Sequence, residues 1–148
     1  MKKFDFKLQK LLEIRQKKED QEKIELSRAS GAYQFVLNKK EKILSNVQVT
    51  LDNLKKNKTG LTLRELQDYD RLIKNSETSV RMLEEEIEAK RKIMQEHIDK
   101  YAALKRDRRV VETLKDKALA KYESDAQMEE QKETDEIGQD LFLRNKEN

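Results

Sequence analysis

Few side chains in this sequence have the types and spacing that catalysis or ligand binding requires. The 148 residues include one histidine, His97, and no cysteine, so no cysteine–histidine nucleophile pair and no cysteine-ligated metal site can form. The three glycines, Gly31, Gly60 and Gly138, are too far apart to build a loop that cradles phosphate. We therefore expect no catalytic residues, no bound cofactor and no enzymatic activity.

The densest acidic cluster, Glu84 to Glu86 with Glu88, is the best candidate for a metal site. On one helix these side chains point around most of the circumference, so they do not converge on an ion. We interpret them as a solvated helix face and His97 as a polar residue tolerated on a packed face. No metal site is expected.

The composition indicates long helices. Charged residues make up 43% of the chain and proline is absent, whereas typical domains carry roughly 25% charged residues and about 5% proline. Folds with many turns are therefore disfavoured. No apolar stretch approaches the ~20 residues of a membrane span, and no secretory signal is expected. A net charge of +3 does not by itself imply nucleic-acid binding. From the composition as a whole we expect a cytosolic chain that is either helical or disordered.

Periodicity favours a coiled coil over disorder. Eighteen positions of the second half follow one another at steps of three and four residues, and twelve of them are apolar. They are Leu66, Tyr69, Ile73, Ser76, Val80, Leu83, Ile87, Lys90, Met94, His97, Tyr101, Leu104, Arg108, Val111, Lys115, Ala118, Tyr122 and Asp125. A weaker row in the first half comprises Ala29, Tyr33, Val36, Lys40, Ile43, Val47, Thr50 and Leu54, and the charged stretch 15–25 is expected to be helical but weakly packed.

A break separates the two rows, because Asn57 to Gly60 carries turn residues and Thr62 with Glu65 is the pattern of a capping box. The predicted fold is all-α: two long helices form an antiparallel coiled-coil hairpin, and the second overhangs at the open end. We expect one elongated unit over 1–148, with helix one at about 3–56, a turn at about 57–61, helix two at about 62–137 and a frayed tail over 138–148. Folding near residue 59 places Leu8 close to Val111.

Charge is polarised at the open end of this hairpin. Residues 2–18 carry a net charge of +5, residues 105–121 carry +4, and residues 123–136 carry −6. Such a surface can steer onto an acidic partner, although charge on a coiled-coil exterior is also simply solvated.

Three segments together resemble the flagellar export protein FliJ family. Phe4, Phe6, Leu8, Leu11 and Leu12 open the chain ahead of a charged helix. The basic run over 105–117 follows late in the chain, and an acidic run over 129–137 follows it. The resemblance covers essentially the whole chain.

The resemblance implies a non-catalytic component of the bacterial flagellar type III protein export apparatus, and so a role in motility. The family's coiled coil is similar to the gamma-subunit stalk of rotary ATPases and promotes assembly and activity of the export ATPase hexamer. Its other implied partners are the cytoplasmic domain of the membrane export gate protein and the flagellar export chaperones. The implied location is cytoplasmic, peripheral to the inner membrane at the flagellar base, without membrane insertion.

Carried over to this sequence, the resemblance implies two partner-binding surfaces. The first, at the open end, would contact the ATPase and comprises Phe4, Phe6, Leu8, Leu11, Arg15, Arg108, Arg109, Glu112 and Lys115. The second would face the gate and comprises Tyr69, Leu72, Ser76, Ser79 and Leu83. Two alternatives stay open: a homodimeric coiled-coil scaffold, and a general holdase of prefoldin type.

Overall fold

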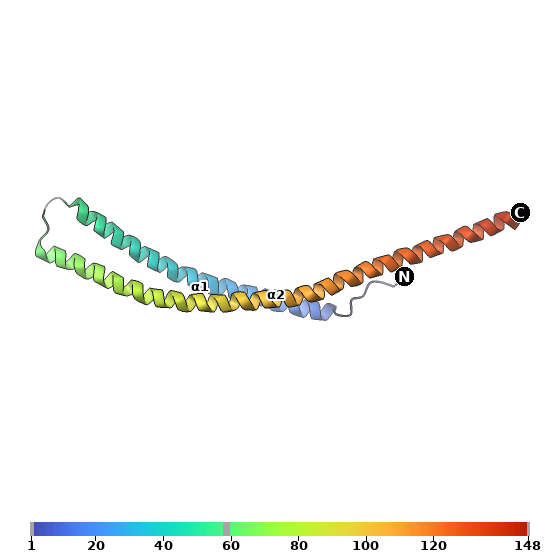
Figure 1. The fold of residues 1–148 in the computed structure, drawn as a ribbon, viewed down its shortest axis with the longest axis horizontal. Helices are drawn as coiled ribbons and strands as arrows, with labels where there is room; N and C mark the ends of the chain where they lie inside the picture. Colours follow the sequence, from blue (N-terminus) through green and yellow to red (C-terminus); the bar gives the residue numbers. More distant parts are fainter. Residues whose placement is uncertain (1, 58–59, 148) are drawn as a thin grey trace. The chain divides into compact units, whose positions relative to one another are not determined.

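The chain is a helical hairpin. A computed structural model describes residues 2–57 and 60–147 and contains two helices, α1 (Gln9–Lys56) and α2 (Leu63–Glu147), which pack against each other. Figure 1 labels both helices along the chain. Within the described ranges there is no strand, so the predicted all-α hairpin is confirmed. No helix in these ranges has a stretch long and apolar enough to cross a membrane.

The capping box at the start of α2 is present as predicted. The Glu65 backbone N–H donates to Thr62 Oγ1 at 3.2 Å, and the Thr62 N–H donates to Glu65 Oε2 at 3.2 Å. These two bonds satisfy amides that a helix start leaves without intrahelical acceptors. Of the predicted turn over 57–61, Lys58 and Thr59 lie outside the described residues.

Helix α1 begins at Gln9, later than the predicted residue 3. In the N-terminal segment (residues 2–8), Phe4 and Phe6 are half-buried while Lys3, Asp5 and Lys7 are exposed. This alternation is that of an extended chain, in which every second side chain points to the same side. An extended segment therefore places both phenylalanines on one face, which a helix cannot do.

Helix α2 continues to Glu147, so the predicted frayed tail after Gly138 is wrong. One glycine costs a helix about 1 kcal/mol, and the residues after Gly138 include strong helix formers such as Leu141, Leu143 and Arg144. Every described residue after Ala126 is exposed. The end of α2 therefore extends beyond its packed part, as the predicted overhang requires.

The described residues group into two units. The terminal unit comprises the chain up to Glu19 and the chain from Ala103 onward, and the hairpin unit comprises Asp20–Ala102. In the hairpin unit, Glu22 pairs with His97 and Lys40 pairs with Glu84, so the numbers rise on one helix as they fall on the other. The helices of this unit are therefore antiparallel. The expectation of one elongated unit over 1–148 stays a prediction.

The predicted rows are the packed faces of both helices. All eight predicted positions of α1 and sixteen of the eighteen on α2 are buried or half-buried; Leu66 and Asp125 are exposed. The buried apolar core is small, with Ala29, Val36 and Val111 its members among the described residues. With so few buried apolar side chains, the polar residues of the packed faces matter for stability.

Candidate functional site

The N-terminal segment packs on α2 within the terminal unit. The Phe4 and Tyr122 rings lie 5.5 Å apart between centroids, with an angle of 56° between their planes. The Tyr122 hydroxyl donates to the Lys2 carbonyl oxygen at 2.6 Å. A ring contact of this geometry stabilises by about 0.5–1.5 kcal/mol beyond the buried area. The first residues of the chain are thus held against α2 by an aromatic pair and a backbone hydrogen bond.

A basic hollow of about 460 Å³ surrounds this contact. Four lysines and two aspartates line it, so its lining carries a net charge of +2. Its lining residues are Lys2, Lys3, Phe4, Asp5, Lys7, Ala118, Lys121, Tyr122 and Asp125. The hollow thus combines two aromatic side chains, Phe4 and Tyr122, with a net positive charge, which favours an acidic partner.

Arg108 is held inside the terminal unit. Its guanidinium donates to the carboxylates of Glu19 on α1 and Glu112 one turn further along α2. The Arg108 side chain is 16% exposed and that of Glu19 is 8% exposed. The hydrogen bond to Glu19, followed by the charges of both carboxylates, raises the pKa of Arg108 above its ordinary value. Arg108 is therefore a packing residue that joins the two helices.

A groove of about 490 Å³ lies next to this ion pair. Arg108, Glu112 and Lys115 of α2 line one side, together with Asp116. The α1 side is lined by Gln9, Leu12, Glu13, Gln16 and Lys17. Eight of the nine lining residues are therefore of polar or charged types, and Leu12 is the apolar one.

The structure brings together some residues of the first predicted surface and separates others. Arg108, Glu112 and Lys115 line the groove, whereas Phe4 lines the basic hollow. Arg15 donates to the Asp107 carbonyl oxygen at 2.7 Å. Phe6 and Leu11 are half-buried, Leu8 is exposed, and Arg109 is exposed and lines neither hollow nor groove. Sequence reasoning left Leu12 out of this surface, although it named the residue among the apolar side chains that open the chain.

The second predicted surface lies in the hairpin unit and divides between two faces of α2. Tyr69, Ser76 and Leu83 are half-buried on the packed face, while Leu72 and Ser79 are exposed. Ser76 Oγ donates to the Leu72 carbonyl oxygen at 2.9 Å, so its hydroxyl is satisfied within the helix. Leu72 is thus the exposed apolar residue of this set.

A groove of about 530 Å³ adjoins this second surface. Leu44 and Val47 of α1 line it together with Ile73, Ser76, Glu77, Val80 and Arg81 of α2. Leu44 is one step off the predicted row of α1 and is 47% exposed. Sequence reasoning missed Leu44 because an isolated exposed leucine is ordinary. The α2 side chains that line the groove with it are identified only by the fold.

A buried acidic residue in the hairpin unit was also missed. Glu22 is 4% exposed and accepts a hydrogen bond from His97 Nδ1 at 2.6 Å, while Lys100 Nζ lies 3.4 Å from its second oxygen. The hydrogen bond from His97, opposed by desolvation and aided by Lys100, lowers the pKa of Glu22 below its ordinary 4.5. Nδ1 of His97 carries the hydrogen in this contact, because the carboxylate only accepts.

A signal for Glu19 and Glu22 was present in the sequence. Stepping back from Ala29 by three and four residues reaches Leu26, Glu22, Glu19 and Arg15, all of which are buried or half-buried. The polar character of this stretch concealed the continuation of the row.

No group of three or more histidine, cysteine, aspartate or glutamate side chains in the described part of the chain is placed to hold a metal ion. The pairs that do form join a carboxylate to a cation, as in Lys40 with Glu84 at 3.2 Å. The arrangement is suited to holding helices together and to presenting charge to a partner.

Comparison with known proteins gives one match. A family model described as flagellar FliJ protein matches residues 4–147, nearly the whole chain. No curated protein and no solved structure matches the chain.

Proposed function

The chain belongs to the flagellar FliJ protein family, and from this membership we propose its function. Members of that family are non-catalytic components of flagellar protein export. The chain is accordingly a component of the flagellar export apparatus and interacts within it. Our proposal concerns which partner each of its two units binds.

In this proposal, the terminal unit binds the export ATPase hexamer and promotes the assembly and activity of that hexamer. The observation that carries it is the joining of the N-terminal segment and the α2 stretch from Ala103 into one unit with a basic hollow and a charged groove. Cationic surfaces speed association with acidic partners and fix orientation. The family relationship supplies the identity of the partner.

The predicted residues of this surface take different roles in the proposal. Arg108 positions the helices through Glu19 and is not itself a contact. Lys115 at the groove and exposed Arg109 make the contacts, and Phe4 holds the N-terminal segment in place. Charge at Lys115 and Arg109 is therefore expected to matter for binding, while Arg108 matters for folding.

The test measures ATP hydrolysis by the cognate ATPase as the chain is added. The wild-type chain is expected to raise the turnover rate, and Lys115→Glu is expected to need about tenfold more chain for the same effect, because a contact charge reverses. Lys42→Glu, exposed on α1 in the hairpin unit, is the matched control and should behave as wild type. Circular dichroism checks that both variants are folded. If the wild-type chain changed neither oligomerisation nor turnover, the ATPase proposal would be wrong.

The hairpin unit binds the cytoplasmic domain of the export gate protein in the same proposal. Leu72, 49% exposed, and the groove lined by Leu44, Val47 and Ser76 support a contact that uses both helices. Export chaperones are the further proposed partners, and the proposed location is cytoplasmic and peripheral to the inner membrane.

A capture experiment with the purified gate domain tests the second surface. Leu72→Asp should weaken binding, because a carboxylate would be placed in an apolar contact. Met82→Asp, an equally drastic change at a side chain that is 68% exposed and outside the second predicted surface, should not. Equal binding by the wild type and Leu72→Asp would exclude Leu72 from the interface.

A further inference from the structure

A second row of side chains runs along the exposed side of α2 in the terminal unit. Its members follow one another at alternating steps of four and three residues, and all are exposed. They are Val110, Leu114, Lys117, Lys121, Ser124, Met128, Gln131, Asp135, Gly138 and Phe142. We call this set the outer row. It lies off the packed face, which uses Val111, Lys115, Ala118 and Tyr122 instead.

The outer row is self-complementary about its middle. Every pair of positions taken inward from the two ends is centred on residue 126. The pairs are Val110 with Phe142, Leu114 with Gly138, Lys117 with Asp135, Lys121 with Gln131, and Ser124 with Met128. Three of these five pairs are complementary in chemistry, since apolar meets apolar, a large side chain meets glycine, and a cation meets an anion, while the two pairs nearest the middle are neither complementary nor repulsive. Two antiparallel copies related by a two-fold axis place such positions opposite each other.

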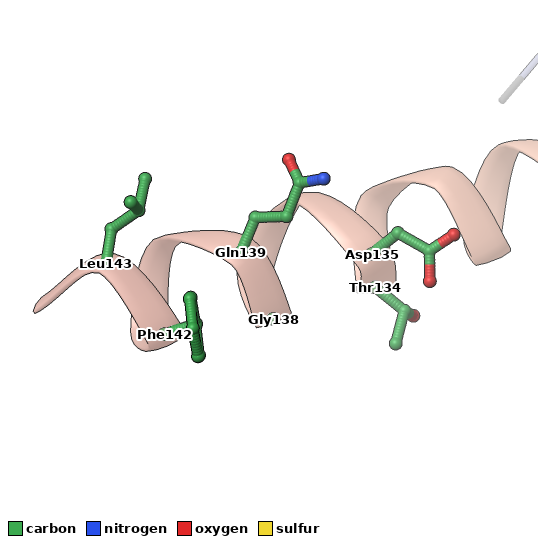
Figure 2. Close-up of a pocket in the computed structure, with 6 residues that line it drawn as sticks. All are labelled: Thr134, Asp135, Gly138, Gln139, Phe142 and Leu143. Atoms are coloured by element: carbon green, nitrogen blue, oxygen red, sulfur yellow. The ribbon is translucent and has the colours of Figure 1, made fainter. Parts of the chain in front are cut away.

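The hollow at Gly138 fits this pairing. It has a volume of about 540 Å³ and is lined by Thr134, Asp135, Gly138, Gln139, Phe142 and Leu143. Figure 2 shows Gly138 along the helix between Asp135 and Phe142. A Cβ placed on Gly138 would meet no atom within 4 Å, so the space is open. The leucine that the pairing brings to this position, Leu114 of the second copy, would occupy the hole as a coiled-coil knob does.

Charge selects the antiparallel orientation. Residues 105–121 carry a net charge of +4, and residues 131–147, which the pairing places opposite them, carry −2 from three basic and five acidic residues. The stretch between them, 122–130, carries −4 and faces its own copy in either orientation, so it does not distinguish the two. A parallel pair would in addition align the two outer stretches with their own copies and place like charges together. Opposite charge across an interface favours one orientation and disfavours the other.

We propose that a second copy of the chain packs antiparallel on the outer row, about a two-fold axis near Ala126. The contact spans 110–142, roughly 50 Å of helix at ~1.5 Å per residue. Met128 and Phe142, 68% and 66% exposed in the single chain, become covered. The packed face of α2 is left as it is, so the hairpin persists in the dimer. Because half of the row is polar, the dimer is weak, and its population rises with protein concentration. This inference does not rest on the proposed function.

Sedimentation from micromolar to millimolar concentration tests the dimer with charge-reversed variants. Lys117→Glu and Asp135→Lys should each raise the dissociation constant by about tenfold, because symmetry turns two ion pairs into two like-charge contacts. Combining the two substitutions should return the constant close to the wild-type value. Glu130→Lys, an exposed charge reversal off the outer row, should leave it unchanged. A monomer at every concentration, or no recovery in the double variant, would overturn the proposal.

Disulfide formation tests the register, since the natural chain has no cysteine. A chain with Ser124→Cys mixed with a chain with Met128→Cys should give a mixed disulfide in higher yield than either chain gives alone. The four-residue offset separates identical positions by about 6 Å along the helix. Chains with Glu123→Cys and Glu130→Cys, exposed but off the outer row, are the control. Higher yields from either chain alone would indicate parallel pairing, and a mixed yield no greater than the control would exclude this interface.

Discussion

Replacing Glu22 by glutamine is expected to destabilise the hairpin unit at neutral pH. Glutamine keeps the shape and one acceptor oxygen but loses the charge that accepts from His97 Nδ1 at 2.6 Å. A hydrogen bond to a charged group contributes about 1.5–3 kcal/mol and a neutral one about 0.5–1.5 kcal/mol. Lys100, whose side chain is 66% exposed, adds only a few tenths of a kcal/mol. The expected loss in the free energy of unfolding is about 1.5 kcal/mol.

The same pair predicts how the loss depends on pH. The pKa of Glu22 in the folded chain lies below its ordinary 4.5, so the folded state binds fewer protons there than the unfolded state does. The stabilisation is therefore fully present above about pH 4.5 and disappears as the pH falls through the lower folded pKa. Glutamine does not titrate, so the gap between wild type and Glu22→Gln should close in acid.

Urea unfolding followed by circular dichroism, at neutral pH and at about pH 3, measures both effects. Glu84→Gln is the control, because Glu84 is a half-exposed partner of Lys40 and should cost less than about 0.5 kcal/mol. Equal stability of wild type and Glu22→Gln at neutral pH would refute the reasoning. So would a gap that stayed constant or widened in acid.

Three further substitutions test the helices themselves. Thr62→Ala removes the hydroxyl that accepts from the Glu65 amide and should lower the unfolding free energy by about 1 kcal/mol, whereas Thr62→Ser should not. Gly31→Ala should raise the unfolding free energy by up to about 1 kcal/mol in thermal unfolding, because the added Cβ meets no atom within 4 Å. A lower unfolding free energy would contradict an open helical position at Gly31. Val111→Ala, at a side chain only 2% exposed, should cost about 1.5 kcal/mol, and Val110→Ala, 59% exposed, should cost much less.

Much of the fold follows from local patterns in the sequence. The three-and-four spacing identified the packed faces because a side chain's position around a helix is fixed by its number. The capping box at Thr62 was predictable because both of its bonds are made within four residues. The extended N-terminal segment was not predicted, since Phe4 is held by Tyr122, which is distant in sequence.

The candidate site was less predictable for the same reason. Glu19 and Glu22 are highly charged residue types that are seldom buried, and only their cationic partners on α2 make burial favourable. Leu44 joins the groove of the hairpin unit through side chains of the other helix. The residues carried over from the family likeness stay predictions for binding.

The most direct test of the central claim, that the N-terminal segment packs on α2 within one molecule, is a distance between spin labels. Labels at Lys7 and Lys121, two residues that line the same hollow, would be measured in chains diluted with unlabelled protein. A narrow distribution at short distance is predicted. A broad distribution at long distance would contradict the packing of the N-terminal segment on α2 on which the proposed ATPase contact depends.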